Sequence, residues 1–394
     1  ATAAKSNSVM AFFDALSTVE KEQQEDVPLS LRDANRDKHG FGHGQGYLYP
    51  HAYRDHWIAQ QYLPRGLQGQ MFYQPSDQGY EAQIQHQVVQ QREAQLAALV
   101  ETGEGLPEAL TFSPEDPKLN RWLQRTLGQA GDRLAQIRDR LFTALQPQRH
   151  HIILDLNARS GLLTWEAVRQ VPEGGVYARV ETNQDLAALT EQAALLPELS
   201  RPVIFQATLA TLPTALLKAA PDIQFDGIVG RNLFGAITPT SAWAASLVND
   251  LAPTGRIALA ETIPRETQRL WALVPAEQLA ADLRDRWRQA ENALYTDAAD
   301  PRFSWDGETL AKLLETAGLQ VDWTQETVQS DLFVSQALCD RWFAPTTAHS
   351  YRQRLAATLS EPDLKAIEKQ LRRTVQNQTV TWQTTQVMLT ARYA

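Results

Sequence analysis

The segment Ile153–Thr164 carries residues whose types and spacing could bind a ligand. It has the pattern of a strand, a tight loop and the start of a helix, with Asp155 near the strand end and Gly161 at the helix start. In doubly wound folds, ligands lie at the carboxyl ends of such strands, above the N-terminus of the following helix. Any α/β domain can contain one such unit, so the pattern alone predicts a site and not its ligand.

A second acidic residue follows at the spacing that nucleoside-binding folds use. The next apolar run, Val176–Val180, ends at Glu181, about 20 residues after the first loop. An acid at this position commonly accepts hydrogen bonds from a ribose diol. The order of the pieces therefore favours a nucleoside-containing ligand more than any single piece does.

The elements that must position these residues follow from the alternation of short apolar runs with amphipathic helices. This alternation, from about residue 150 onward, predicts βαβ units stacked on a parallel sheet. The apolar runs are 152–156, 176–180, 203–205, 227–230 and 257–260. Upstream, 91–149 is mostly helical, and 1–90 is rich in aromatic, His, Gln and Gly residues. We therefore predict an N-terminal segment (1–90), a helical linker (91–149) and a Rossmann-type α/β domain (150–394).

The C-terminal part resembles the class I S-adenosylmethionine (SAM)-dependent methyltransferases. Their first motif has the form Val-Leu-Asp-Leu-Gly-x-Gly-x-Gly, and Asp155 and Gly161 match its acid and its last glycine. Glu181 matches the acidic end of their second strand. Phe225–Phe234 resembles their fourth strand with its exit loop, and Leu251–Ile257 resembles the turn into the fifth. The resemblance implies a class I methyltransferase-like, doubly wound and mostly parallel sheet.

The resemblance also implies a set of residues that would bind SAM. The set is Asp155, Asn157, Ala158, Arg159, Gly161, Glu181, Thr208 and Asn232. No catalytic base can be named, and Asn232 is the best-placed polar candidate near the methyl acceptor.

Three departures from the family pattern bear on SAM binding. Asn157 and Arg159 replace the first two glycines, and Gln206–Thr208 offers no acid for the adenine amine. Asn tolerates a left-handed backbone, whereas the second glycine normally lets the backbone approach the ligand closely. Arg159 could pair with the ligand carboxylate or fill the pocket. The sequence leaves two alternatives open, a SAM-binding domain and a degenerate structural one.

A second resemblance covers about the first 90 residues and rests on several short motifs. These are Lys5–Asn7, Val27–Arg32, Tyr47–Pro64 and Phe72–Glu81, with Ala52 where the family usually has Asp. They resemble the C-terminal part of the RarA/MgsA family of replication- and recombination-associated AAA+ ATPases. The resemblance implies a domain that assembles homo-tetramers, an ATPase domain upstream, and DNA as a partner of the parent protein.

The resemblance implies that this sequence, which starts at Ala1, begins inside that family domain. It has no G-x-x-x-x-G-K-[ST] segment, so ATP hydrolysis by these residues is not expected. We expect the C-terminal part of an ATPase fusion, whose methyltransferase-like domain serves as an accessory or scaffold module. The alternative is an active SAM-dependent methyltransferase with an unknown acceptor.

Composition limits the remaining function classes. The single cysteine, Cys339, excludes cysteine-rich metal sites and favours a reducing, cytoplasmic setting. The spacing of His39, His43, His51 and His56 does not support a metal site, and no metal is expected. The net charge of −9 argues against a chain-wide nucleic-acid surface. No apolar run reaches the roughly 18 residues of a membrane span, so no membrane partner is expected.

Overall fold

The structure is a computed structural model of the 394-residue chain. It describes residues 6–21, 72–76, 78–103, 117–194, 196–345 and 350–393. The chain forms two compact units, 1–106 with 111–136 and 107–110 with 137–394. The boundary at 136/137 falls inside helix α3 (Pro117–Leu145). The predicted three-part division, with its linker at 91–149, stays a prediction.

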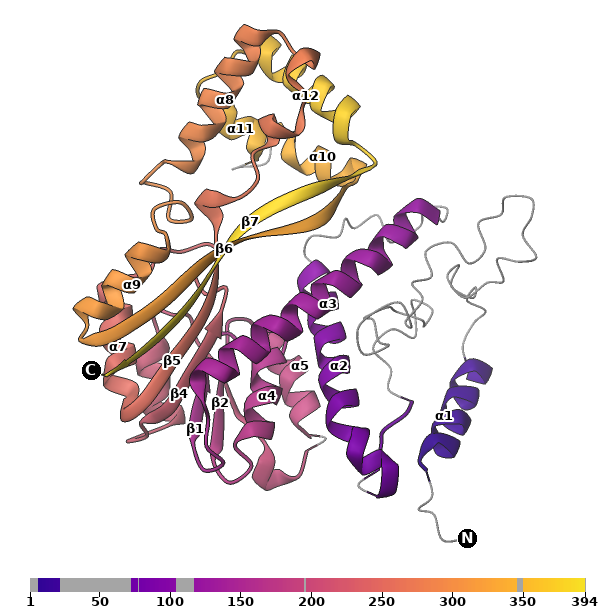
Figure 1. Ribbon diagram of the computed structural model, residues 1–394, viewed down its shortest axis with the longest axis vertical. Helices are drawn as coiled ribbons and strands as arrows, with labels where there is room; N and C mark the ends of the chain where they lie inside the picture. The colour runs from indigo at the N-terminus through magenta and orange to yellow at the C-terminus, as the bar shows by residue number, and fades with distance from the viewer. Residues whose placement is uncertain are drawn as a thin grey trace. The chain divides into compact units, whose positions relative to one another are not determined.

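A seven-stranded sheet forms the centre of the second unit (Figure 1). The strands are β1 (Ile152–Asp155), β2 (Gly175–Val180), β3 (Val203–Gln206), β4 (Phe225–Arg231), β5 (Leu251–Ile263), β6 (Leu319–Val334) and β7 (Gln378–Tyr393). Their order is β3-β2-β1-β4-β5-β7-β6. The first five run parallel, and β7 is antiparallel to both β5 and β6. This topology confirms the predicted α/β fold class with a doubly wound, mostly parallel sheet.

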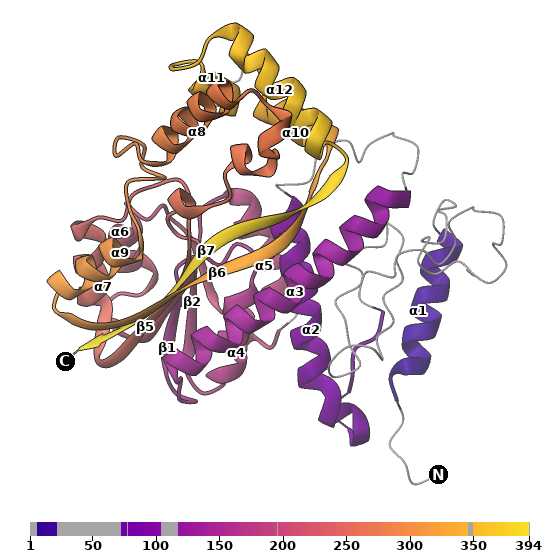
Figure 2. The ribbon, with the colours of Figure 1, turned by 45° about the horizontal axis from the view of Figure 1, so that its top comes forward.

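Helices cover both faces of this sheet (Figures 1 and 2). They are α4 (Leu162–Gln170), α5 (Asn183–Ala194), α6 (Leu212–Ala219), α7 (Ser241–Asp250) and α9 (Gly307–Thr316). On one face, α6, α7 and α9 bury the largest apolar cluster, and on the other α4 and α5 pack against β2. Burial on both faces explains why the strands are continuous apolar runs. From β1, the strands β2 and β3 are added on one side of the sheet, and β4 and β5 are added on the other. A crevice is expected above the carboxyl ends of β1 and β4, where this order changes direction.

A helical subdomain, which the sequence analysis did not predict, interrupts this pattern twice. We call it the helical cap, and its described residues are 264–306, 335–345 and 350–377. Its helices are α8 (Ala281–Tyr295), α10 (Gln336–Trp342), α11 (Tyr351–Leu355) and α12 (Glu361–Val375). The cap has an apolar core of its own, with Trp287 and Ile367 fully buried.

The cap is carried on a two-stranded ribbon (Figures 1 and 2). β6 and β7 pair along all 16 of their residues, whereas β5 pairs with β7 over 256–263 alone. The far ends of β6 and β7 therefore extend beyond the sheet, and Leu332, Val380 and Trp382 pack against the cap core.

In the first unit, one carboxylate joins α1 (Ser8–Lys21) to the start of α2 (Gly79–Gly103). The Glu81 side chain is buried and accepts hydrogen bonds from the Ser6 hydroxyl (2.5 Å), the Asn7 backbone N–H (3.0 Å) and the Tyr73 hydroxyl (2.9 Å). It also accepts the backbone N–H of Ser76 at 2.9 Å. Two separate motifs of the second resemblance, Lys5–Asn7 and Phe72–Glu81, thus meet at one side chain. The motifs at 27–32 and 47–64, and the four histidines, lie outside the described residues.

We predict that Glu81→Gln releases the N-terminus of α1, because a neutral amide cannot accept this many bonds. The bonds from Ser6 and Ser76 hold the pKa of Glu81 well below its ordinary value. Because the folded-state pKa is lowered, the ionised carboxylate stabilises the fold at pH values above its ordinary pKa of 4.5. This contribution to stability is lost as the pH falls toward the lowered pKa. Hydrogen exchange of α1 peptides at pH 7 should therefore be faster in the variant than in the wild type.

The matched control is Asp14→Asn, since Asp14 is an exposed residue on the same helix. It should leave the exchange of α1 unchanged. Equal protection of α1 in Glu81→Gln and the wild type would contradict this role of the carboxylate.

Candidate functional site

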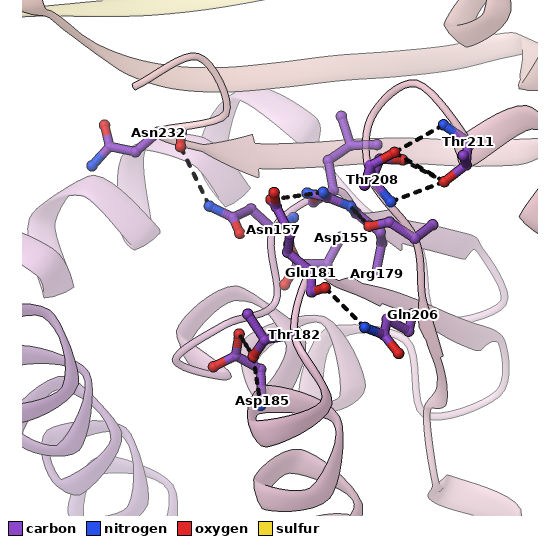
Figure 3. A network of polar contacts seen from close by, with 12 residues as sticks. Asp155, Asn157, Arg179, Glu181, Thr182, Asp185, Gln206, Thr208, Thr211 and Asn232 are labelled. Atoms are coloured by element: carbon purple, nitrogen blue, oxygen red, sulfur yellow. Dashed lines mark hydrogen bonds and ion pairs between the residues drawn. The ribbon is translucent and has the colours of Figure 1, made fainter. Parts of the chain in front are cut away.

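Asp155 ends β1 and fixes the loop that follows it (Figure 3). Its buried carboxylate accepts the backbone N–H of Asn157 at 3.0 Å and the hydroxyl of Thr164, in α4, at 2.7 Å. Burial raises the pKa of Asp155 to about 6, against the opposing effect of these bonds. One carboxylate therefore holds the strand, the loop and the first turn of the helix in a fixed arrangement.

Gly161 is the residue of this loop that takes the left-handed conformation, at φ 72°. Asn157, which was expected to tolerate the left-handed conformation, does not adopt it. A Cβ atom at Gly161 would lie 2.2 Å from Nε1 of Trp165, whose indole donates to the Gln192 side chain at 3.1 Å. Both the backbone angle and the packing therefore require glycine here.

Asn157 joins the first loop to the exit of β4. Its Nδ2 donates to the carbonyl oxygens of Arg231 (2.9 Å) and Asn232 (3.4 Å). Figure 3 shows the second of these contacts. The side chain that replaces the first motif glycine thus crosslinks two strand exits, a role that its position in the motif did not predict.

Arg179, which the sequence analysis did not select, lies at the centre of the strand ends (Figure 3). Its side chain is 2% exposed. Nε donates to the carbonyl of Ala207 at 2.7 Å, Nη1 to the carbonyl of Leu156 at 3.1 Å, and Nη2 to Oε2 of Glu181 at 2.9 Å. One guanidinium therefore connects the exits of β1, β2 and β3. Its signal in the sequence was a charged residue inside an apolar parallel strand.

The other predicted residues line the same strand ends. The Glu181 side chain is 63% exposed, and its backbone carbonyl accepts Nε2 of Gln206 at 3.0 Å. Ala158 is buried and its N–H donates to the carbonyl of Arg179 at 2.9 Å. Arg159 is half-buried in the loop. The exposed Thr208 bonds with Thr211 at the start of α6. The structure brings these residues to one edge of the sheet, and their role in binding stays a prediction.

A second buried carboxylate, also missed from sequence, fixes the exit loop of β4. Glu261, on β5, accepts the backbone N–H groups of Leu233 (2.9 Å) and Phe234 (3.3 Å). Asn232 is held with φ 51°, its Oδ1 accepting the N–H of Thr262 at 3.1 Å. Burial raises the pKa of Glu261 to about 7, and the Arg231 charge opposes this shift.

The strand order, the antiparallel β7 and the loop at Asp155 define a class I methyltransferase-like domain. Comparison with known proteins identifies the segment before it. Residues 1–92 match the family described as "MgsA AAA+ ATPase C terminal". This confirms the predicted resemblance of the N-terminal segment.

Two curated proteins are similar to this part of the chain. Replication-associated recombination protein A of Bacillus subtilis is 39% identical over 77 residues, which are 19% of this chain and 18% of that protein. An uncharacterized protein of Thermotoga maritima is 37% identical over 83 residues, 21% of this chain and 13% of that protein. The chain thus spans less than a fifth of the length of these relatives.

Two solved structures are similar to this chain at low sequence identity. The YcgJ protein of Bacillus subtilis has 14% identity, a TM-score of 0.41, and coverage of 66% of this chain and 99% of its own. A precorrin-6y C5,15-methyltransferase of Geobacter metallireducens has 12% identity, a TM-score of 0.34, and coverage of 66% and 88%.

Two further findings concern the described residues alone. None of their helices combines the length and the apolar character that a bilayer crossing requires. They also contain no group of three or more His, Cys, Asp and Glu side chains arranged to hold a metal ion.

We predict that Glu261→Gln changes the pH dependence of stability. A raised carboxyl pKa means that the folded chain keeps a proton that the unfolded chain loses, so stability falls as the pH rises from 5 toward 7. The amide lacks this titration. The stability advantage of the wild type over the variant should therefore shrink by about 2 kcal/mol between pH 5 and pH 8.

Urea unfolding followed by tryptophan fluorescence at each pH measures this difference. A gap between the two proteins that is the same at pH 5 and pH 8 would contradict the titration of Glu261 in this range.

Proposed function

We propose that the chain is an assembly and accessory module, in which a RarA/MgsA-type C-terminal segment is joined to a methyltransferase-like domain that does not transfer methyl groups. The match of residues 1–92 supports the first part. An upstream AAA+ ATPase domain, assembly into homo-tetramers, contact with DNA through the parent protein and a cytoplasmic setting belong to this proposal.

Arg179 is the observation that carries the second part. A ribose diol would need the carboxylate of Glu181, and Nη2 of Arg179 already donates to Oε2 of this group. Because the Glu181 side chain is 63% exposed, this ion pair contributes at most about 1 kcal/mol, so competition with it would weaken nucleoside binding up to about fivefold. The guanidinium is also buried, and it would have to find new partners if the ligand displaced it.

Two further positions fit a nucleoside cofactor poorly. Gln206 stands where the family places an acid against the adenine amine, and its Nε2 bonds to the backbone of Glu181. Arg159 introduces a long side chain where glycine normally permits close approach of the ligand. The residues at the strand ends thus satisfy one another.

The alternative, a SAM-dependent methyltransferase, is favoured by two observations. The Glu181 side chain is exposed, and Asp155 holds the first loop in the strand-loop-helix geometry that such cofactors use. A test of cofactor binding therefore separates the two functions.

Calorimetric titration of the full chain with SAM and with its demethylated product, up to about 1 mM ligand, is that test. We expect neither heat of binding nor a shift in the melting temperature. A micromolar Kd for either ligand in the wild type would overturn the accessory proposal and favour the enzyme.

Two variants at one position show whether Arg179 is the obstacle. Arg179→Ala removes both the charge and the volume of the side chain, whereas Arg179→Met removes the charge and keeps most of the volume. If competition for Glu181 is what blocks the ligand, both variants should gain binding of SAM. A gain in Arg179→Ala alone would instead identify filled volume as the cause, and circular dichroism checks that both fold.

The assembly part of the proposal has its own test. Size-exclusion chromatography with light scattering should show the full chain at the mass of four copies, 44.1 kDa each. A monomer at tens of micromolar chain would contradict assembly through this segment, whatever the result with SAM.

A further inference from the structure

Three arginine side chains gather around two aromatic rings in the helical cap. The Arg269 guanidinium lies 3.8 Å from the ring centroid of Tyr295, at the end of α8. Arg302 and Arg354 each lie 5.1 Å from the ring centroid of Phe303. The ring centroids of Tyr295 and Phe303 are 4.8 Å apart, so the two rings form one aromatic cluster. The three arginines that contact it come from different segments of the cap.

One carboxylate is bonded to two of these three arginines. Among the described residues, Asp300 is the carboxylate that pairs with Arg302 (2.7 Å) and with Arg354 (3.0 Å), and both pairs use the same oxygen, Oδ2. Asp300 also accepts Nε of Arg302, so Arg302 binds it through two atoms. Two guanidinium groups thus share one carboxylate.

Three further acids act on the cluster: Glu291 and Glu266 attract Arg269, and Asp297 attracts Arg354. Of these, Glu291 is bonded to other partners. The Glu291 carboxylate accepts the backbone N–H groups of Leu270 (2.7 Å) and Trp271 (3.0 Å) and the Tyr351 hydroxyl (2.8 Å). Arg269 in turn donates to the backbone carbonyls of Thr267 and Arg265. These bonds hold Arg269 in place and leave its charge without a directly bonded carboxylate among the described residues.

The cluster is partly shielded from water and still accessible. The side chains of Arg302 and Arg354 are 35% and 18% exposed. Partial burial strengthens the attraction of an anion to these groups compared with a fully hydrated surface. Burial raises the pKa of Tyr295 to about 12, so its hydroxyl remains a hydrogen-bond donor at neutral pH.

The cluster is also tied to the exit loop of β4. Thr238 in that loop bonds to the Ser304 hydroxyl at 2.8 Å and to the carbonyl of Pro301 at 3.2 Å. Arg265 pairs with Asp306 at 3.1 Å. The segment that carries Arg302 is therefore held at both the cap and the sheet, which fixes the guanidinium before any ligand arrives.

We propose that Arg302, Arg354 and Tyr295 form a binding site for a phosphate oxyanion. Guanidinium groups match the geometry of phosphate oxygens and can donate two bonds to one group. An anion between Arg302 and Arg354 also relieves the repulsion between two cations that share Asp300. The phosphate is carried either by a small molecule or by the backbone of a nucleic acid.

The first test uses inorganic phosphate and the full chain. Thermal unfolding in sodium phosphate is compared with that in sodium chloride at equal ionic strength, and phosphate should raise the melting temperature in a saturable way. Arg354→Gln should weaken the apparent phosphate affinity at least about tenfold, which corresponds to the loss of one charge-assisted contact.

The matched control is Arg288→Gln, an exposed arginine of α8 that pairs with Asp285 at 3.0 Å. It lowers the net charge equally and should leave the phosphate effect unchanged. Tyr295→Phe keeps the ring contacts and removes the hydroxyl, so it should weaken the apparent phosphate affinity a few-fold. This second variant keeps the proposal testable if Arg354→Gln does not fold.

The site is overturned if the wild type melts at the same temperature in both salts, or if Arg288→Gln loses as much affinity as the cluster variants. A fluorescent single-stranded oligonucleotide distinguishes the two sources. Binding that phosphate competes away and that Arg354→Gln loses indicates a nucleic-acid backbone, whereas stabilisation by phosphate without oligonucleotide binding indicates a small-molecule phosphate. Neither outcome depends on whether SAM binds at the strand ends.

Discussion

A charge buried at the end of a parallel sheet must be bonded in all directions, since an unpaired buried ion costs several kcal/mol. Arg179 meets this requirement with the exits of three strands: it donates to Leu156 after β1, to Ala207 after β3 and to Glu181 after β2. The positions of these exits decide what can enter the crevice. The polar groups at these strand ends are hydrogen-bonded to one another.

The sequence was sufficient for the α/β fold class and for the strand-loop-helix around Asp155, because apolar runs and glycine positions are local signals. It was insufficient for Arg179 and Glu261, whose burial depends on strands that are neighbours in space alone. The helical cap was missed for a similar reason. Its core combines helices from two chain segments that are separated by α9 and β6, and neither segment carries the complete apolar cluster.

Carboxylates that accept backbone N–H groups recur in both units. Glu81 holds the start of α1 in the first unit, and Asp155, Glu261 and Glu291 hold loop and helix ends in the second. Such groups explain why an acid in a sequence motif need not contact a ligand. The acid at the end of the Phe72–Glu81 motif, which the resemblance singled out, has a structural task that its position in the sequence did not reveal.

The same reasoning separates the two regions of the second unit where a ligand could bind. At the strand ends, the donors of Arg179 reach two carbonyls and a carboxylate, so a ligand that takes Oε2 of Glu181 competes with an existing bond. In the cap, Arg302 and Arg354 share one oxygen of Asp300, and the proposed anion would bond to these two guanidinium groups. The sharing of one carboxylate by two arginines is therefore the reason why we propose a ligand site of this domain in the cap.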